Sequence, residues 1–410
     1  MVTTQLQPTR KRVDKAIEPQ SETSEAARLL AAVSDFAPLL GPRSEEIEQA
    51  RRLPRDIADR LSQLGLFRTL VPRSHGGLEL SVPEIIPLIE TLAAADSSVG
   101  WVAMIATVSQ LFITRLPRVT YDQVYADGSD IMVVGAGTPA GRAEVIDGGY
   151  RVCGRWPFAS GCQNAHWIVG HCVVCRDGQP LTSEQGPTTR FVIAPAARWR
   201  VEETWLASGL AGTGSHHVSL DNVEVPDAST FDLFHGPSCL PGPLVSALAP
   251  FTPTLHAAVA VGIAKAAVAD LVSLAGAGRR QLFAAIDLRD SPAFQHALGK
   301  LSAELRAARA LLEVQAESEW RRAVAGTLDD KADFADALQG SAWIHAACTN
   351  VVSDCYTLAG ASAVLNTSPL QRRLRDVHAA RQHIFAQERF YASAGKHELG
   401  FAPVHPISGQ

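Results

Sequence analysis

The sequence predicts an α+β protein of several domains, with helices first, a small β domain next and a helical bundle last. Three observations indicate this fold class. Apolar residues recur three and four positions apart up to about residue 116, short β-rich runs fill residues 130–228, and long helical patterns resume at about Pro243. A chain of 410 residues is long enough for two or three domains with a sizeable core.

The first 128 residues divide into a tail and a helical domain. Residues 1–23 mix Thr, Gln, Pro, Lys and Arg without periodicity, which is typical of a disordered tail. Residues 24–128 form the predicted N-terminal helical domain, in which "SEEIEQARRLPRDIADRLSQLGLF" keeps a helical spacing with a stop at Gly65. The segment "SVPEIIPLIETLAAADSSVGWVAMIATVSQLFITRL" continues the helical pattern, with an interruption near residues 96–100.

Residues 129–240 are predicted to form the central β domain, either a small barrel or a sandwich. Its runs, which include "IMVVGAG", "HWIVGHCVV" and "SHHVSLDNVEV", are separated by Gly, Pro and Asp-Gly. No G-x-G-x-x-G follows a strand and opens a helix, which argues against a Rossmann site. A single CxxC pair, Cys172 and Cys175, lies within an apolar strand-like run, so we expect buried apolar side chains and no metal site.

Residues 241–400 are predicted to form a four-helix bundle, followed by a tail over residues 401–410. The first and third helical segments, "TLHAAVAVGIAKAAVADLVSLAGAG" and "FADALQGSAWIHAACTNVVSDCYTLAGA", are nearly uncharged. The second is long and amphipathic, and the fourth is "SPLQRRLRDVHAARQHIFAQERFYASA". One bundle of this size has a limited interior, so the uncharged segments indicate surface that other subunits bury.

Composition and charge exclude several functional classes. The net charge of −5 provides no basic excess for nucleic acid or an anionic membrane. The chain does not open with a basic and then apolar segment, and no run of about 18 uncharged apolar residues indicates a membrane span. Seven scattered cysteines fit a reducing compartment better than a disulfide framework. We therefore expect a cytoplasmic protein.

Several stretches resemble the flavin-dependent monooxygenase branch of the acyl-CoA dehydrogenase superfamily. They are "GLFRTLVPRSHGGLELSVPEIIPLIETLAAADSSVGWVA", "GGYRVCGRWPFASGCQNAHW", "TWLASGLAGTGSHHVSLDNVEVP" and "AGASAVLNTSPLQRRLRDVHAARQH". The resemblance covers about residues 25–395 and implies the acyl-CoA dehydrogenase fold. Members of this branch are similar to the hydroxylases of hydroxyphenylacetate and of a phenolic steroid intermediate, and to dibenzothiophene monooxygenase.

The resemblance also implies the chemistry and the partners. The chain would be the oxygenase component of a two-component monooxygenase, and a separate NAD(P)H:flavin reductase would supply reduced FMN or FAD. The reduced flavin would react with O2 to a C4a-hydroperoxyflavin that hydroxylates an aromatic or heteroatom-containing small molecule. The resemblance and the uncharged bundle helices both favour a homotetramer.

One histidine near the C-terminus distinguishes the monooxygenase interpretation from its alternative, which is an FAD-bound acyl-CoA dehydrogenase or nitroalkane-oxidase-like enzyme. Acyl-CoA dehydrogenases usually carry a Glu base shortly after the "RD" of the last bundle helix; that position falls at or beside Ile384 here, and Glu388 is interpreted as a solvated residue. His383 stands there instead, and in the resembling monooxygenases a histidine at this position points at the flavin. An imidazole of near-neutral pKa could keep the peroxide protonated or remove a substrate proton.

The stretch "GRWPFASGC" contains the remaining residues predicted to contact the flavin ring. Trp156 and Phe158 supply an apolar wall, and Gly161 lets the backbone pass close to the cofactor. In the resembling oxygenases the serine that matches Ser160 lies near flavin N5, where its hydroxyl can accept the N5–H bond. The alternative for this stretch is a buried β-bulge with an inward hydroxyl.

Five further residues are assigned by resemblance to the cofactor tail and the substrate. "AGRRQLF" resembles the arginine region that grips flavin phosphate, often across a subunit interface, and indicates Arg280. "AGASA" resembles a turn near the cofactor tail of a neighbouring subunit and indicates Gly360 and Ser362. Some phenol-hydroxylating relatives carry a histidine where this chain has Ser109 and Gln110. Neither can act as that base, so a less acidic aromatic, an indole or heterocycle, or an amine or sulfur compound is expected.

Overall fold

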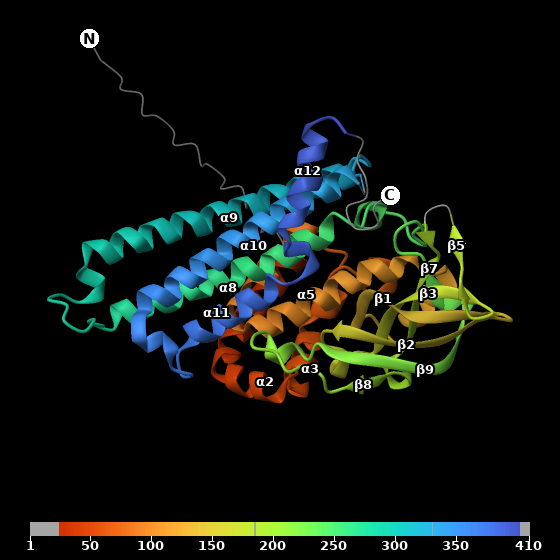
Figure 1. The fold of residues 1–410 in the computed structure, drawn as a ribbon, viewed down its shortest axis with the longest axis horizontal. Helices are drawn as coiled ribbons and strands as arrows, with labels where there is room; N and C mark the ends of the chain where they lie inside the picture. The colour runs from red at the N-terminus through yellow and green to blue at the C-terminus, as the bar shows by residue number, and fades with distance from the viewer. Residues whose placement is uncertain (1–23, 184–185, 330, 402–410) are drawn as a thin grey trace, which may run out of the picture.

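A computed structural model describes residues 24–183, 186–329 and 331–401, and the predicted tails lie outside these ranges except for residue 401. The order of helices, β domain and bundle follows the chain, as predicted (Figure 1). In Figure 1 the sheet occupies one end of the molecule and the long bundle helices the other, with α5 running between them. The N-terminal helices are α1 (Glu25–Phe36), α2 (Ser44–Ala50), α3 (Arg55–Leu64), α4 (Val82–Ala95), α5 (Ser97–Phe112) and α6 (Arg118–Val124).

Helix α5 is the element on which the two halves of the molecule meet. Asp96 begins it, because the Asp96 carboxylate accepts hydrogen bonds from the backbone N–H groups of Ser98 and Val99 at 3.0 and 3.1 Å. Gly100 lets α5 approach α4 closely: a Cβ there would lie 2.4 Å from the Cα of Ala93. The close crossing fixes the depth of the next residue, Trp101.

The β domain is built on one mixed sheet of eight strands with the order β10-β7-β3-β1-β2-β9-β8, and β4 pairs with β3. Strands β1 and β3 run parallel, whereas the other pairs are antiparallel. The strands are β1 (Val133–Ile146), β2 (Gly149–Ala159), β3 (Trp167–Arg176), β4 (Gln179–Pro180), β7 (Thr189–Pro195), β8 (Arg200–Glu202), β9 (His216–Pro226) and β10 (Thr230–Phe231), and β5 (Thr182–Ser183) pairs separately with β6 (Gly186–Pro187).

The bundle follows the short helix α7 (Pro243–Ser246) and consists of α8 (Phe251–Gly276), α9 (Pro292–Val324), α10 (Ala332–Ala359) and α11 (Pro369–Ala380). The predicted fourth helix is shorter than expected. The chain leaves α11 after Ala380, makes the 3-10 turns η12 (Ile384–Ala386) and η13 (Glu388–Phe390), and resumes as α12 (Tyr391–Glu398). His383 therefore lies in the turn after α11 and not on a helix.

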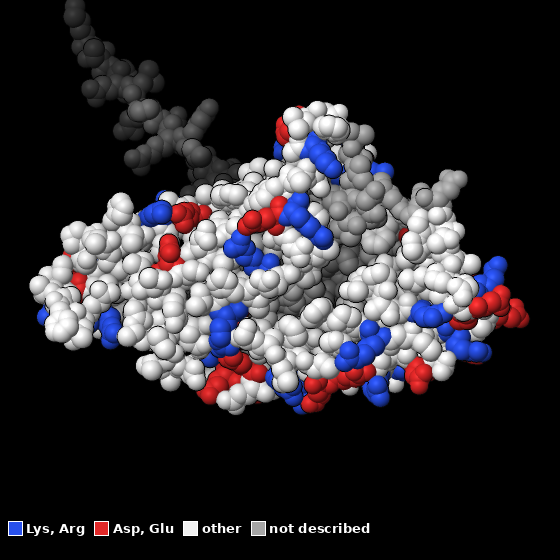
Figure 2. Space-filling model, viewed as in Figure 1, with Lys and Arg blue, Asp and Glu red and all other residues white. Residues whose placement is uncertain are grey.

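In the part of the chain that the structure describes, two helical stretches are long and apolar enough to cross a membrane by length and composition alone. They are Ser97–Arg115 and Phe251–Gly276, and 89% and 61% of their most apolar windows are buried inside the protein. Burial of this extent is typical of core helices. On the face shown in Figure 2, charged side chains of both signs gather at the β-domain end and along one long edge, and smaller groups of both signs lie over the bundle.

Candidate functional site

The two residues predicted to be catalytic, Ser160 and His383, lie on either side of one tryptophan. The indole N–H of Trp101 donates a hydrogen bond to the Ser160 hydroxyl at 3.1 Å. The ring of the same tryptophan meets the His383 ring edge to face, with 5.5 Å between the ring centroids. A helix, the end of a strand and the turn after the last bundle helix thus bring residues 101, 160 and 383 into one site.

Two further histidines stand behind His383. His256, on α8, stacks on the His383 ring with a centroid distance of 4.1 Å and also meets Trp101 edge to face at 5.3 Å. His345, on α10, is fully buried, and neither of its ring nitrogens has a hydrogen-bond partner. Within the described ranges no group of three or more His, Cys, Asp or Glu is arranged to hold a metal.

The His383 imidazole is neutral, and its proton can be placed. Burial lowers the pKa of His383 to about 4, which corrects the expectation of a near-neutral pKa. The Nδ1 atom accepts a long hydrogen bond of 3.4 Å from the backbone N–H of Phe385. A neutral ring that accepts at Nδ1 carries its proton on Nε2, so His383 presents a hydrogen-bond donor to the site.

Ser160 belongs to a chain of buried hydroxyl groups. Its Oγ lies 2.7 Å from the Oγ of Ser215, which lies 2.7 Å from the Oγ1 of Thr213. The Thr213 hydroxyl in turn donates to the backbone carbonyl of Leu210 at 2.7 Å. All three hydroxyl-bearing residues are buried, so these contacts are shielded from competing water.

The backbone around Ser160 turns one aromatic ring outward. Phe158 has a φ of 64°, and its side chain is 63% exposed. The ring lies 6.1 Å from that of Trp205 and 6.3 Å from that of His217. An accessible aromatic surface beside a hydroxyl with acceptor capacity fits the flat, partly apolar ring of a flavin. The positions of Phe158 and Ser160 are thus compatible with contact to a flavin ring. Their roles in flavin binding remain predictions.

Trp156, in contrast, is not available to a cofactor. Its side chain has no exposed surface, and its indole N–H donates to the His171 carbonyl at 2.6 Å. A Cβ added to Gly141, Gly154 or Gly170 would lie 2.0, 2.7 or 2.9 Å from the indole ring. Three strands thus lack side chains where they cross this ring. Trp156 is the centre of the β-domain core, and its assignment to the flavin wall is corrected.

Gly161 is required by protein packing. Its φ is +77°, and a Cβ there would lie 2.4 Å from Met132 Cε and 3.0 Å from Val102 Cγ1. The close approach predicted at this glycine is therefore made to the protein, including α5, and not to a cofactor. The consequence for the site is indirect, because Gly161 holds the β2 end, and with it Ser160, against the helix that carries Trp101.

Ser109 and Gln110 lie away from the site on α5. Eight or nine residues separate them from Trp101, which corresponds to about 12–14 Å along the helix axis. The Ser109 hydroxyl donates to the Ile105 carbonyl at 2.8 Å. The Gln110 amide binds the Phe67 carbonyl and accepts from the backbone N–H of residue 70. Both side chains are engaged with the protein backbone, so the structure lends no support to their predicted contact with substrate.

The residues assigned to the cofactor tail lie at the opposite end of the bundle. Arg280 follows α8, whose end at Gly276 is 20 residues and so about 30 Å from His256 along the helix axis; in Figure 1 this connection is at the end remote from the sheet. A Cβ at Gly360 would lie 4.0 Å from Gln281 Nε2, so the two predicted regions are neighbours. One chain cannot bring them to its own His383. Arg280, Gly360 and Ser362 stay predictions that need a neighbouring subunit.

The position of the dehydrogenase base carries no acid. Glu388 is exposed and pairs with Arg381 at 2.7 Å, as expected of a solvated residue. Ile384 begins the turn that His383 caps. This arrangement gives no support to the acyl-CoA dehydrogenase alternative.

Sequence reasoning missed four residues of the site: Trp101, Thr213, Ser215 and His256. The first three lie within two of the stretches that resemble the monooxygenase branch, "DSSVGWVA" and "LAGTGSHH", but their side chains were given no role. His256 could have been noticed as a lone histidine in the nearly uncharged segment "TLHAAVAVG".

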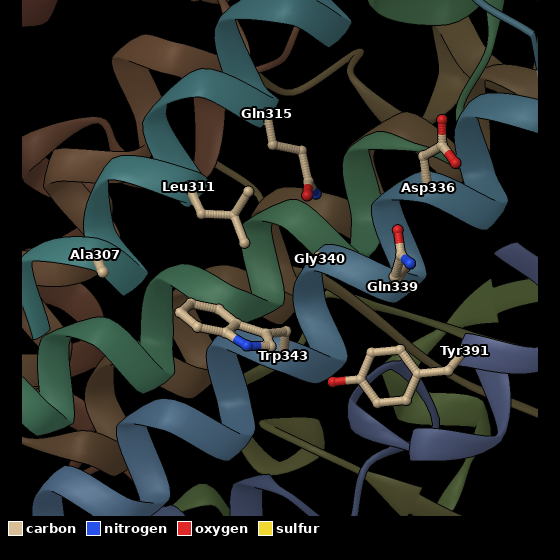
Figure 3. A pocket seen from close by; sticks show the side chains of 8 residues that line it. All are labelled: Ala307, Leu311, Gln315, Asp336, Gln339, Gly340, Trp343 and Tyr391. Carbon is tan, nitrogen blue, oxygen red and sulfur yellow. The ribbon is translucent and has the colours of Figure 1, made fainter. Parts of the chain in front are cut away.

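A separate groove lies on the outer face of the bundle, with a volume of about 480 Å³. It is bordered by α9, α10 and the start of α12, and Trp343 and Tyr391 lie along it beside Leu311 and Gln315 (Figure 3). Trp343 is 41% exposed. This aromatic lining on an open surface is typical of a contact between proteins.

Comparison with known protein families matches two parts of the chain. The acyl-CoA dehydrogenase N-terminal domain matches residues 23–116, and the acyl-CoA dehydrogenase C-terminal domain matches residues 254–388. An indole-3-acetate monooxygenase of Pseudomonas putida is 33% identical over 92% of this chain and 93% of its own length. The flavin-dependent monooxygenase oxygenase subunit HsaA of Rhodococcus jostii is 31% identical over 88% of this chain and 96% of its own length.

Solved structures show the same architecture. XiaF from a Streptomyces species, in complex with FADH2 and glycerol, superimposes with a TM-score of 0.87 and 25% identity, over 92% of this chain and 96% of XiaF. The dibenzothiophene monooxygenase TdsC of a Paenibacillus species shares the fold, with a TM-score of 0.79 and 18% identity over 93% of this chain and 100% of TdsC.

Proposed function

Since this chain belongs to the flavin-dependent monooxygenases of the acyl-CoA dehydrogenase family and is an oxygenase component of that family, we propose that Ser160 binds the reduced flavin and His383 assists oxygen transfer to the substrate. The observation that carries this proposal is the single tryptophan that contacts both residues. Bound reduced flavin supplies the electrons that activate O2.

The chain's own residues have three tasks in this scheme. The exposed ring of Phe158 provides a surface on which the flavin can pack, and the Ser160 hydroxyl accepts a hydrogen bond from it. The neutral His383 donates from Nε2 to an oxygen atom in the site. His256 and Trp101 hold that imidazole between them, so the donor is fixed in direction before the reactants arrive.

The substrate we propose is an aromatic heterocycle of the indole type. The walls supplied by Trp101, His256 and Phe385 are aromatic, and burial lowers the pKa of His256 well below its usual value, so this ring is neutral. Two relatives, from Pseudomonas putida and Acinetobacter baumannii, are named indole-3-acetate monooxygenases. A panel of indole, indole-3-acetate, resorcinol and dibenzothiophene distinguishes this class from phenols and sulfur heterocycles.

A separate reductase and further copies of this chain are the proposed partners, in the cytoplasm. A relative from Rhizobium is named an FADH(2)-dependent resorcinol hydroxylase, oxygenase component, which supports a reductase that delivers reduced flavin. A homotetramer is supported by the connection after α8, where Leu282 and Phe283 are 84% and 97% exposed beside Arg280. Phe283→Asp should lower the molar mass measured by light scattering; an unchanged mass would contradict this interface.

The experiment for the function mixes the anaerobic complex of protein and reduced FMN, and then of reduced FAD, with oxygenated buffer. A flavin species that is neither reduced nor oxidised and persists, with hydroxylated product when indole is present, is expected for the wild type. His383→Asn should lower product per reduced flavin by about 100-fold or more, the usual contribution of a positioned proton donor or acceptor. His378→Asn, the same change at an exposed residue of α11, is the control. Normal product yield in His383→Asn would exclude the assigned role.

A further inference from the structure

The hydroxyl chain that begins at Trp101 has only one arrangement of its protons. Three contacts join Ser160 to Ser215, Ser215 to Thr213, and Thr213 to the Leu210 carbonyl, each at 2.7 Å. Each hydroxyl has a single proton to donate, and a carbonyl oxygen can only accept. Three contacts therefore share three protons.

The carbonyl at the end of the chain sets the direction. Thr213 must donate to Leu210 O, so Thr213 accepts from Ser215, and Ser215 in turn accepts from Ser160. At the other end, the Trp101 indole N–H donates to Ser160. Ser160 thus has no proton left to donate. Of its two acceptor positions, Trp101 uses one and the second remains for a ligand.

The two redox forms of a flavin differ at the atom that the Ser160 hydroxyl is proposed to meet. Reduced flavin carries N5–H, a donor, whereas oxidised flavin has a lone pair at N5 and can only accept. A hydroxyl that can only accept therefore forms a hydrogen bond with reduced flavin, whereas with oxidised flavin it places two acceptors against each other. We propose that Ser215 and Thr213 are positioning residues that lock Ser160 as an acceptor and so make the site select reduced flavin. This inference rests on the proposed function, because it uses the contact between Ser160 and N5.

The backbone groups of Leu210, at which the series of hydroxyl groups ends, explain why the direction of its hydrogen bonds is stable. The Leu210 backbone N–H donates to the buried carboxylate of Asp376 at 2.7 Å, which ties this turn to α11. The Leu210 carbonyl also accepts from the indole N–H of Trp205 at 3.0 Å and from the backbone N–H of Thr213 at 3.1 Å, and the Thr213 hydroxyl makes the shortest of its three contacts. Because both polar groups of Leu210 are held, the terminal acceptor cannot turn away from Thr213.

Equilibrium binding of flavin, without turnover, tests the proposal. Oxidised and dithionite-reduced FMN and FAD are titrated anaerobically into the wild type, Ser215→Ala, Thr213→Val and Ser160→Ala. Thr213→Ser serves as the conservative variant, and Ser219→Ala, in the following strand β9, as the matched control. The measured quantity is the ratio of the two dissociation constants, oxidised over reduced.

The variants should change this ratio by different routes. Ser215→Ala and Thr213→Val free the Ser160 proton, so oxidised flavin should bind about tenfold tighter while reduced flavin changes by less than about threefold. Ser160→Ala removes the acceptor, so reduced flavin should bind about tenfold more weakly. Thr213→Ser and Ser219→Ala should keep the wild-type ratio. A variant that merely loosens the fold would weaken both forms.

Three results would overturn the inference. If the wild type prefers reduced flavin and Ser215→Ala keeps its ratio, the directed chain is wrong and the proposed function stands. If Thr213→Ser loses the preference as Thr213→Val does, packing and not the hydroxyl sets it. If the wild type does not bind reduced flavin, the proposed function fails and the inference with it.

Discussion

The pH dependence of stability can show directly that His383 is held neutral. Burial lowers the pKa of His383 from 6.5 to about 4. Between these values the unfolded chain binds a proton that the folded protein does not, so stability is lost as the pH falls from 6.5 toward 4. The full effect is 2.5 pKa units, about 3 kcal/mol, and about 2 kcal/mol of it falls between pH 7 and pH 5.

His383→Asn removes this effect and keeps the local structure. Asparagine can accept the hydrogen bond from the Phe385 N–H that His383 Nδ1 now accepts, so the turn after α11 retains its cap. Relative to the wild type, the variant should therefore gain about 2 kcal/mol of unfolding free energy when the pH is lowered from 7 to 5. Because part of the His383 ring remains accessible, this figure is an upper value.

The assay is urea unfolding of the flavin-free protein at pH 7 and pH 5, followed by tryptophan fluorescence at equal protein concentration. His256 and His345 are present in both proteins, and burial, the largest cause of their lowered pKa values, is common to both, so most of their contribution cancels in the difference. His378→Asn, which removes an exposed imidazole, controls for the substitution itself. If the difference between His383→Asn and the wild type is the same at both pH values, the pKa of His383 in the folded protein equals that in the unfolded chain, and our account of a pKa lowered by burial is wrong.

Three other predictions concern buried residues. Gly161→Ala places a Cβ 2.4 Å from Met132 Cε at a φ of +77°. The unfolding free energy should therefore fall by about 1–3 kcal/mol, and reduced flavin should bind more weakly. Wild-type values in both urea unfolding and flavin titration would contradict the packing argument. Burial raises the pKa of the Glu319 carboxyl well above its usual value, so wild-type stability is lost as the pH rises through that pKa. In urea unfolding, the unfolding free energy of Glu319→Gln should therefore rise relative to that of the wild type between pH 5 and pH 8. A constant difference would mean that the carboxyl group is already ionised in the folded protein at pH 5. Trp156→Phe loses the hydrogen bond to the His171 carbonyl, so it should lower the unfolding free energy by about 1–3 kcal/mol and leave the flavin affinity unchanged. Weaker flavin binding by this variant would show that Trp156 contacts the cofactor after all.

The fold and the two central residues were predictable from the sequence because their signals are local. Helical and strand periodicities mark each part of the chain, and His383 and Ser160 each stand in a short motif that resembles the monooxygenase branch. Local motifs could not say which side of the backbone a side chain takes. Trp156 and Phe158 stand two positions apart, yet one is fully buried and the other is 63% exposed, because Phe158 adopts a positive φ.

By itself, the sequence determined the α+β class, the order of the three parts, the family and the identity of Ser160 and His383 as candidates. Only the tertiary structure decided how these candidates meet, because α5, the end of β2 and the turn after α11 are distant in sequence and converge on Trp101. It also decided the charge of His383 and the hydrogen-bonding direction of Ser160. Both depend on burial and on partners more than 50 residues away in the chain, which no local pattern of residues encodes.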